Sequence, residues 1–402
     1  MAPSSPPQTP PSAVVIVLFL LFSTALLCES RLSLDYYSKT CPSFTKIMQD
    51  TITNKQITSP TTAAGALRLF FHDCLPNGCD GSILISSTAF NKAERDADIN
   101  LSLPGDPFDL IVRAKTALEL ACPNTVSCSD ILAVATRDLV TMLGGPYYNV
   151  YLGRKDSRVS SASSLEGKLP KPTMSMSQLI NLFSSSGFTV QEMVALSGAH
   201  TIGFSHCKEF SSNISNDTHY NPRFAQALKQ ACSGYPNNPT LSVFNDIMTP
   251  NKFDNLYYQN LPKGLGLLES DHGLYGDPRT KPFVELYARD QNKFFQDFAK
   301  AMQKLSIYGI KTGRRGEIRH RCDAELAGSQ SILKNKKKIG LRSEKLYKIL
   351  GVCRCELGHE SLGYSDIDKK TITPTKFVKA KDYLEKPESS KEGVSSHISE
   401  KI

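Results

Sequence analysis

The number and position of the cysteines constrain this chain more than any other feature of its sequence. Three of its eleven cysteines lie near the ends of the chain, at Cys28, Cys353 and Cys355. Eleven less these three leaves an even set of eight in the body: Cys41, Cys74, Cys79, Cys122, Cys128, Cys207, Cys232 and Cys322. In an exported protein such a set predicts four disulfides, although eight cysteines allow 105 pairings and spacing alone does not choose among them. No CxxC pair faces another at zinc-finger distance, so zinc is the weaker interpretation.

The first thirty residues predict export. The apolar run AVVIVLFLLFSTALL is followed by CES before Arg31. This run is shorter than the roughly 20 residues of a membrane span, but it suits a signal peptide. We therefore predict a signal peptide over residues 1–30 and secretion to the cell exterior or wall, with the vacuole as a second possible destination. An uncleaved membrane anchor is the competing interpretation. No later stretch is long and apolar enough to cross a membrane, so stable membrane insertion is not expected.

Residues 31–323 have the spacing of a mainly α-helical domain. Apolar residues recur every three or four positions, as at Phe108, Ile111 and Val112, and alternating strand patterns are scarce. Thr189 and Glu192 occupy the positions of a capping box. Helical segments are predicted within residues 60–74, 106–122, 127–145, 189–200 and 282–305.

The composition changes after residue 323. Residues 324–402 are rich in Lys, Glu and Ser and poor in apolar residues, which predicts a largely disordered extension. The formal charge of the whole chain, +8, is mild, and no basic run interleaved with aromatic residues precedes residue 330. Nucleic acid is therefore not an expected partner.

The heptapeptide RLFFHDC, residues 68–74, places an arginine and a histidine four residues apart. On a helix this spacing puts Arg68 and His72 on one face. A histidine near neutrality takes up and returns a proton, and a fixed guanidinium stabilises a developing anion. The pair therefore fits acid–base catalysis, and a surface arginine beside a core histidine is the alternative for these residues taken alone.

The residues that follow, HDCLPNGCDGS, gather oxygen ligands. Asp73, Asp80 and Ser82 stand close together in the sequence, and the glycines between them let backbone carbonyls turn inward. Because Ca²⁺ binds six to eight oxygen ligands, this loop predicts a calcium site. A stapled turn with solvated acids is the alternative.

A second histidine, His200, stands in ALSGAHTIG after a helix that Gly198 is expected to interrupt. Its ring would then project from the end of that helix. A neutral histidine in this position fits an axial ligand of haem iron that is backed by a carboxylate. A hydrogen-bonded core histidine is the alternative.

Seven motifs occur together in one order: RLFFHDC, GCDGS, SCSDILAVATRD, LGRKDS, LSGAHTIG, FDNLYY and GEIRHRC. In this order and at these separations the chain resembles the secretory plant peroxidases, the class III haem peroxidases. The resemblance covers residues 32–323. It implies a mainly α, two-part helical fold, with haem b between a distal half, about 31–150, and a proximal half, about 170–323.

The resemblance implies a role for particular residues of the distal half. His72 matches the distal base, and Arg68 matches the arginine that stabilises the transition state. Asn100 matches the residue that orients His72, with Glu94 continuing this network. Phe71 matches the aromatic wall of the distal pocket.

On the proximal side the resemblance implies that His200 is the axial ligand of the haem iron and that Asp271 is its carboxylate support. Pro170 matches a proline at the site where aromatic donors bind.

The resemblance also implies two Ca²⁺ sites and a disulfide pattern. The distal calcium set is Asp73, Pro76, Gly78, Asp80 and Ser82, with Glu94 beside it. The proximal set is Thr201, Asp246, Thr249, Lys252 and Asp254. The implied disulfides are Cys41–Cys122, Cys74–Cys79, Cys128–Cys322 and Cys207–Cys232.

The implied activity is reduction of hydrogen peroxide to water with one-electron oxidation of small phenolic reductants, by a monomeric enzyme. His72 would take the first proton of the peroxide and return it to the leaving oxygen while Arg68 stabilises the charge. The alternative is a secreted, disulfide-stapled scaffold that binds haem without turnover. Its expected sign is loss of one of four functional residues, and all four are present: Arg68, His72, His200 and Asp271.

Two positions depart from the family pattern, and three are glycosylation sequons. Tyr148 stands where the family usually has tryptophan, which is expected to leave catalysis intact, and Pro76 replaces a more usual valine, which is expected to reshape the calcium loop. Of the sequons, Asn213 and Asn216 lie in a polar loop where one glycan is predicted. Asn100 is predicted to be buried and bare.

Overall fold

The structure is a computed structural model that describes residues 32–215, 218–324 and 377–378. Within these residues the fold is mainly α, as predicted, with eleven α-helices and three short strands. The predicted signal peptide lies outside the described residues, as does almost all of the extension over 324–402. In the described part no helix has the length and apolar character needed to cross a membrane.

The chain divides into two compact units. The first unit contains described residues 32–171, 185–187 and 295–324. The second unit contains 172–184, the described part of 188–294, and 377–378. The domain limits expected from the sequence stay a prediction. The segment that begins at residue 295 belongs to the first unit, because most of its contacts are made there.

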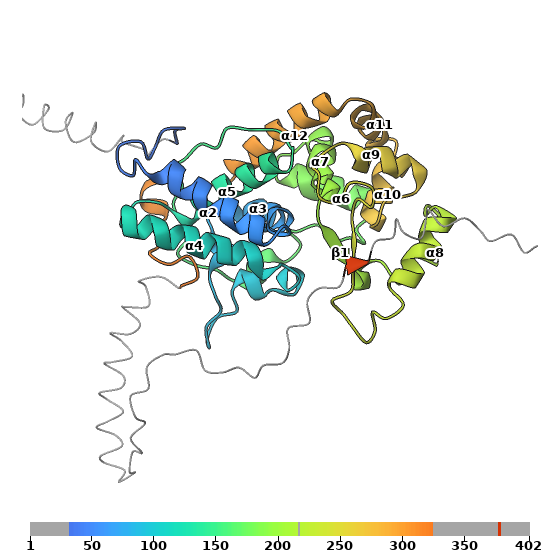
Figure 1. Ribbon diagram of the computed structural model, residues 1–402, viewed down its shortest axis with the longest axis horizontal. Coiled ribbons are helices and arrows are strands. Elements are labelled where there is room, and N and C mark those ends of the chain that lie inside the picture. Colours follow the sequence, from blue (N-terminus) through green and yellow to red (C-terminus); the bar gives the residue numbers. More distant parts are fainter. Residues whose placement is uncertain (1–31, 216–217, 325–376, 379–402) are drawn as a thin grey trace, which may run out of the picture. The chain divides into compact units, whose positions relative to one another are not determined.

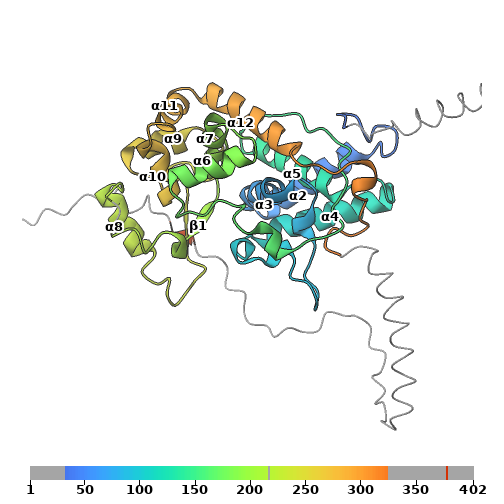
Figure 2. The same cartoon turned by 180° about the vertical axis from the view of Figure 1, so that it is seen from behind.

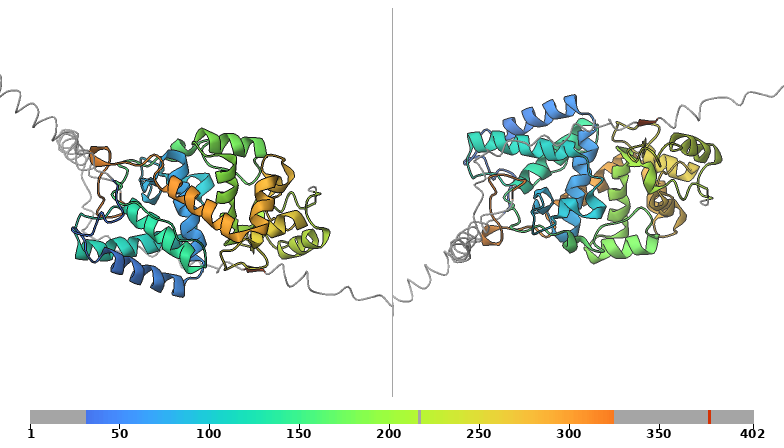
Figure 3. Two further views of the ribbon diagram at one scale, coloured as in Figure 1. Left: turned by 90° about the horizontal axis from the view of Figure 1, so that it is seen from above. Right: turned by 90° about the horizontal axis from the view of Figure 1, so that it is seen from below.

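The first unit is built mainly from α2 (Phe44–Thr58), α3 (Thr62–Asn77), α4 (Gly105–Ala121) and α5 (Cys128–Met142). Helices α2 and α3 both pack against α4 and α5, in the blue-to-teal ribbons of Figure 1. The views from above and below in Figure 3 also show α2 and α4 side by side. Most residues of α3 are buried, so the polar residues of its C-terminal half are held inside the unit.

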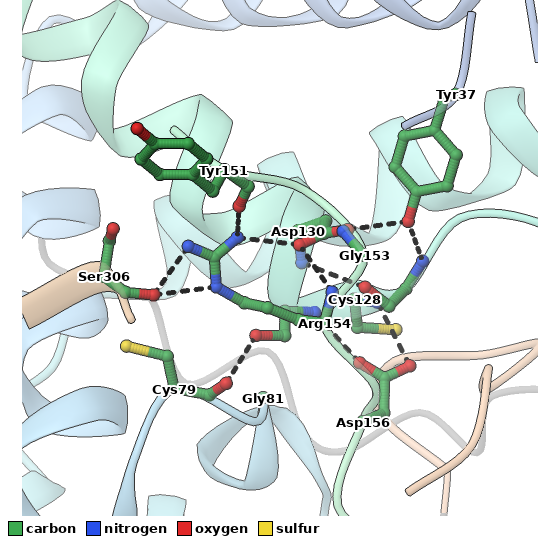
Figure 4. Close-up of polar contacts among 12 residues, drawn as sticks. Tyr37, Cys79, Gly81, Cys128, Asp130, Tyr151, Gly153, Arg154, Asp156 and Ser306 are labelled. Atoms are coloured by element: carbon green, nitrogen blue, oxygen red, sulfur yellow. Dashed lines mark hydrogen bonds and ion pairs between the residues drawn. The ribbon is translucent and has the colours of Figure 1, made fainter. Parts of the chain in front are cut away.

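A buried ion pair joins α5 to the extended segment that follows it in the first unit (Figure 4). Arg154 Nη1 donates to Asp130 Oδ1 at 2.8 Å, and neither side chain is exposed. Arg154 Nε and Nη2 both donate to the backbone carbonyl of Ser306, at 2.9 and 2.6 Å. Tyr37 donates its hydroxyl to the second oxygen of Asp130 at 2.7 Å. The guanidinium thus connects α5 to the last residue of α12 (Gln291–Ser306).

The second unit contains six further helices and the start of α12: α6 (Met176–Ser185), α7 (Val190–Ser197), α8 (Pro222–Ala231), α9 (Leu256–Asn260), α10 (Glu269–Gly276) and α11 (Lys281–Arg289). Helices α7, α9 and α10 each pack against α11, as Figure 2 shows from behind. In the core of this unit the rings of Phe253 and Phe294 stack, with centroids 5.7 Å apart.

A small sheet also belongs to the second unit. Strand β1 (Phe204–His206) pairs antiparallel with β2 (Ser242–Phe244), with Phe204 opposite Phe244. Strand β3 (Phe377–Val378) pairs parallel with the other edge of β2. This two-residue strand is the one described part of the predicted extension beyond residue 324.

The predicted helical segments occur in the structure, with one difference. The capping box of Thr189 and Glu192 begins α7, and Ser127 caps α5. The segment over 282–305, however, is two helices, because the backbone at Asp290 is extended, with φ −131° and ψ 96°. The Asp290 carboxylate accepts the backbone N–H of Lys293 at 2.9 Å and so satisfies the start of α12.

The structure contains the four disulfides that the resemblance implies. Cys41–Cys122, Cys74–Cys79 and Cys128–Cys322 lie in the first unit, and Cys207–Cys232 lies in the second. Cys128–Cys322 joins residues that are 194 positions apart in the sequence.

Candidate active site and calcium sites

Helix α3 of the first unit carries Arg68 and His72 on successive helical turns. His72 is buried, and its Nδ1 lies 2.7 Å from Asn100 Oδ1. Asn100 donates its amide nitrogen to the backbone carbonyl of Glu94 at 2.8 Å, which makes its oxygen the acceptor toward His72. The hydrogen of the imidazole is therefore on Nδ1, and Nε2 carries a lone pair.

The surroundings of His72 keep it neutral. Burial, together with the positive charge of Arg68, lowers the pKa of His72 to about 3, although the bond to Asn100 acts in the opposite direction. At neutral pH the ring is therefore an uncharged base with a fixed tautomer. Phe71 lies beside it, with the two ring centroids 6.1 Å apart.

Ser102 holds the guanidinium of Arg68. Nη1 donates to the carbonyl of Ser102 at 3.0 Å and Nη2 to its hydroxyl at 2.9 Å. Sequence reasoning assigned no role to Ser102, which appears there only as the third residue of the sequon at Asn100. The structure places Asn100, which is 1% exposed, and Ser102 in one short loop that contacts both His72 and Arg68.

His200 lies in the second unit, on the 3-10 turn Gly198–Thr201 that directly follows α7. The turn starts at a glycine because a Cβ there would stand 2.4 Å from Phe294 and 2.5 Å from the hydroxyl of Tyr258. His200 Nδ1 lies 2.9 Å from Asp271 Oδ1. The ring is 37% exposed, whereas the carboxylate is 1% exposed, so the imidazole projects from a buried support.

Asp271 is held as a carboxylate. Burial acts to raise its pKa, but the contact with His200 and the hydrogen bonds that the carboxylate accepts prevail and hold the pKa below its ordinary value. Its second oxygen accepts the backbone N–H of Leu268 at 2.9 Å, at the start of α10. Among the described residues no hydrogen bond reaches His200 Nε2. A histidine oriented through Nδ1 by a carboxylate, with Nε2 open, is the donor that haem iron takes, so this site fits the group.

The first calcium set surrounds the loop after α3. Asp73 accepts the backbone N–H of Gly81 at 2.9 Å, and Ser82 donates its hydroxyl to Glu94 at 2.7 Å. Burial raises the pKa of Asp73, and the negative charges of Asp80 and Glu94 raise it further. Asp80 also contacts the ammonium of Lys311. Carboxylate and hydroxyl oxygens are the ligands that suit a divalent cation, but in the described part of the chain no three acidic, histidine or cysteine side chains already converge on one point.

The carbonyls of Pro76 and Gly78 belong to the same loop: Pro76 lies in the last turn of α3 and Gly78 follows it. Gly78 has φ 100°, and a Cβ there would stand 2.3 Å from the carbonyl oxygen of Gly309. Only glycine therefore fits where the two backbones meet.

The second calcium set lies together in the second unit. Thr249 donates its hydroxyl to Asp254 at 3.2 Å, and the backbone N–H of Asp254 donates to the hydroxyl of Thr201 at 3.4 Å. Thr249 Oγ1 also lies 3.4 Å from Asp246 Oδ2, and the N–H of Lys252 donates to the carbonyl of Thr249. Burial raises the pKa of Asp246. These oxygens form a compact hard-donor set that also fits Ca²⁺.

The expected site residues therefore divide between the two units. The first unit holds Arg68, Phe71, His72, Asn100, the first calcium set and Pro170. Pro170 is half-buried and lies next to Lys171, where the first segment of this unit ends. The second unit holds His200, Asp271 and the second calcium set.

A mainly helical domain with a neutral histidine beside an arginine, and a second histidine backed by a carboxylate, has the parts of a haem peroxidase. A model of the peroxidase family matches residues 46–290. Peroxidase 31 of Arabidopsis thaliana is 72% identical over 308 residues, which cover 76% of this chain and 98% of the relative. Peroxidase 63 and Peroxidase 6 of the same plant are 69% and 57% identical over 314 residues, each covering 77% of this chain and 96% of the relative. The chain belongs to the peroxidase family, as a secretory plant (class III) peroxidase.

Family membership confirms the class that the seven motifs indicated. The protein is an oxidoreductase that uses hydrogen peroxide and a reducing substrate, and haem and calcium are the cofactors of its family. The scaffold without turnover is not favoured.

Proposed function

We propose that this protein reduces hydrogen peroxide with haem b bound through His200, and that its electron donors are small phenolic compounds. When bound, haem would supply the two electrons that cleavage of the O–O bond needs; two phenolic molecules would each return one electron and one proton, so that both oxygens of the peroxide end as water. The proposal depends most on the tautomer of His72, which the 2.7 Å contact between its Nδ1 and Asn100 Oδ1 fixes. A base with its lone pair on Nε2 is ready to receive the proton of a peroxide.

His72 and Arg68 divide the work on the peroxide. His72 Nε2 takes the proton from one oxygen and returns it to the other, which leaves as water. Arg68, held by Ser102, stabilises the negative charge that develops on the leaving oxygen. Proton transfer by a positioned base contributes typically about 10²–10⁴-fold in rate, so the base and the positive charge are both needed.

Asp271 acts through His200. By accepting the Nδ1 hydrogen it fixes the ring orientation and makes the imidazole a stronger donor at Nε2. Pro170 is proposed to contribute to the binding of the phenolic donor, because the resemblance places a proline there.

We further propose that two Ca²⁺ ions bind, one in each calcium set, and that they hold the loops next to His72 and His200. Ser82 and Thr201 link the two sets to the active-site residues, because Ser82 donates to Glu94 and Thr201 follows His200 directly. We also propose a monomer that is secreted after loss of residues 1–30, with the vacuole as a second destination. A glycan on Asn213 or Asn216 fits the polar loop, and burial keeps Asn100 bare.

Two alanine variants of the purified, haem-loaded enzyme test the proposal. His72→Ala is expected to keep its haem, read from the Soret band, and to slow the reaction with peroxide by about 10²–10⁴-fold. His200→Ala is expected to lose haem on gel filtration. Oxidation of guaiacol by the wild type tests phenolic turnover. Equal haem retention in His200→Ala would contradict the axial assignment, and a wild type that binds haem but never oxidises guaiacol would contradict the donor class.

A further inference from the structure

The carboxylate of Asp271 receives a hydrogen-bond donor to which the proposed mechanism gives no role. Tyr257 donates its hydroxyl to Asp271 Oδ1 at 2.8 Å. This is the oxygen that lies 2.9 Å from His200 Nδ1. The phenol and the imidazole therefore share one acceptor atom, while Oδ2 is occupied by the backbone N–H of Leu268.

Tyr257 is fixed in this position by its own helix. It lies on α9, which packs against α11, and Asn255 holds the start of α9 by donating to the carbonyls of Tyr287 and Ala288 at 2.9 and 3.0 Å. The side chain of Tyr257 is 1% exposed. Its ring meets the ring of His200 edge to face, at 5.9 Å between centroids and 87° between planes. The hydroxyl consequently reaches Asp271 without freedom to turn elsewhere.

Two hydrogen bonds on one carboxylate oxygen weaken each other, because each donor draws on the same electron density. A phenol donating to a carboxylate forms a strong, charge-assisted bond. It reduces the negative charge that Oδ1 offers to the Nδ1 hydrogen of His200, and so reduces the imidazolate character of that ring. Asp271 without Tyr257 would therefore make His200 a stronger donor to a metal at Nε2.

We propose that Tyr257 is a positioning residue that sets the donor strength of His200 by sharing the acceptor oxygen of Asp271. The proposal rests on the proposed role of His200 as the axial ligand of haem. The ligand strength of an axial histidine is one of the levers by which a protein sets the reduction potential of haem iron. Tyr257 would thus hold the potential of this enzyme above the value that a His–Asp pair alone gives.

Tyr258 provides a matched control on the same helix. It is also a fully buried tyrosine, and its hydroxyl donates to the backbone carbonyl of Val194 at 2.7 Å. Tyr258→Phe removes one buried hydroxyl as Tyr257→Phe does, but it leaves the contacts of Asp271 intact. A difference between the two variants therefore reports on the Asp271 contact and not on the loss of a buried hydroxyl in general.

The experiment measures the haem-loaded enzyme by spectroelectrochemistry, and by the iron–histidine stretching frequency in its ferrous form. Tyr257→Phe is expected to shift the ferric–ferrous equilibrium about tenfold toward the ferric form, which is about 59 mV for a one-electron couple, and to raise the stretching frequency. Tyr258→Phe is expected to change neither. Replacement of Tyr257 by 3,5-difluorotyrosine, a stronger donor of the same shape, is expected to shift both quantities in the opposite direction.

The outcomes separate this proposal from the one on which it rests. If Tyr257→Phe and the difluorotyrosine variant both match the wild type in potential and frequency, Tyr257 only fills space, and the axial role of His200 stands. If the wild type shows no iron–histidine stretching band that is lost in His200→Ala, the axial assignment is wrong and this proposal is overturned with it.

Discussion

The contact between Asn100 and His72 allows a quantitative prediction for Asn100→Leu. Leucine has nearly the shape of asparagine, but it removes the oxygen that lies 2.7 Å from His72 Nδ1. This bond matters most when His72 has taken the proton of the peroxide, because the ring is then charged. A hydrogen bond to a charged group contributes about 1.5–3 kcal/mol. At 1.36 kcal/mol for each factor of ten, its loss corresponds to a rate reduced about 10- to 150-fold.

The assay is stopped-flow mixing of the haem-loaded enzyme with hydrogen peroxide, followed by the change in the Soret band. The wild type, Asn100→Leu, His72→Ala and the double variant form a cycle. Because Asn100 acts through His72, Asn100→Leu is expected to have no effect once His72 is alanine. The haem content of each variant serves as the control for folding.

Two results would refute this reasoning. An unchanged rate in Asn100→Leu would mean that the contact neither orients nor stabilises the imidazole. An equal loss in the presence and in the absence of His72 would mean that Asn100 supports the fold of the loop and not the base.

Three further predictions concern pH, stability and calcium. The rate of reaction with peroxide should stay level as the pH falls below 6.5, the ordinary pKa of histidine, because the ring of His72 stays neutral. The rate should drop only as the pH approaches the pKa of His72, about 3. A half-maximal rate near pH 6.5 in a stopped-flow pH profile would contradict this. Arg154→Met leaves the carboxylate of Asp130 buried without its partner and should lower the free energy of unfolding in denaturant by about 3–5 kcal/mol. Lys46→Met, which breaks the exposed pair with Asp50, should lower it little. Equal losses in the two variants would show that the buried pair contributes no more than the exposed one. Asp80→Ala and Asp254→Ala should each remove one equivalent of Ca²⁺ in metal analysis of the purified enzyme, and a variant that keeps both equivalents would remove its calcium set from the proposal.

Much of the helical structure could be predicted because its signals are local. The capping box of Thr189 and Glu192 and the serine before α5 lie within one turn of the helix that they begin. The break at Asp290 was missed because the apolar spacing of α12 continues that of α11. The aspartate itself was the available signal, because Asp is a preferred N-cap residue and its carboxylate accepts the backbone N–H of Lys293, three residues later.

The two candidate histidines and one partner of each, Asn100 and Asp271, could be named from the sequence, but several further contacts in the two units could not. Ser102 reaches Arg68 only because the chain turns back after Asn100, and no periodic pattern encodes that turn. Tyr257 reads as a core residue in FDNLYY, and its hydroxyl gains meaning only when α10 brings Asp271 against it. Arg154 stands in the motif LGRKDS, yet its partner, the carbonyl of Ser306, is 152 residues away.

The first unit is completed by the part of its chain that is synthesised last. Cys322 closes onto Cys128, the backbone of Glu317 bridges to Asp156, and the carbonyl of Ser306 receives the guanidinium of Arg154. Until residues 306–322 have been synthesised, α2 to α5 therefore lack these three contacts, and their buried charges remain open to water. The described residues of the second unit, apart from 377–378, all precede residue 295 and are therefore available earlier in translation. A premature stop codon just after residue 295 would thus damage the first unit, including the surroundings of His72, although most of that unit precedes the stop in the sequence.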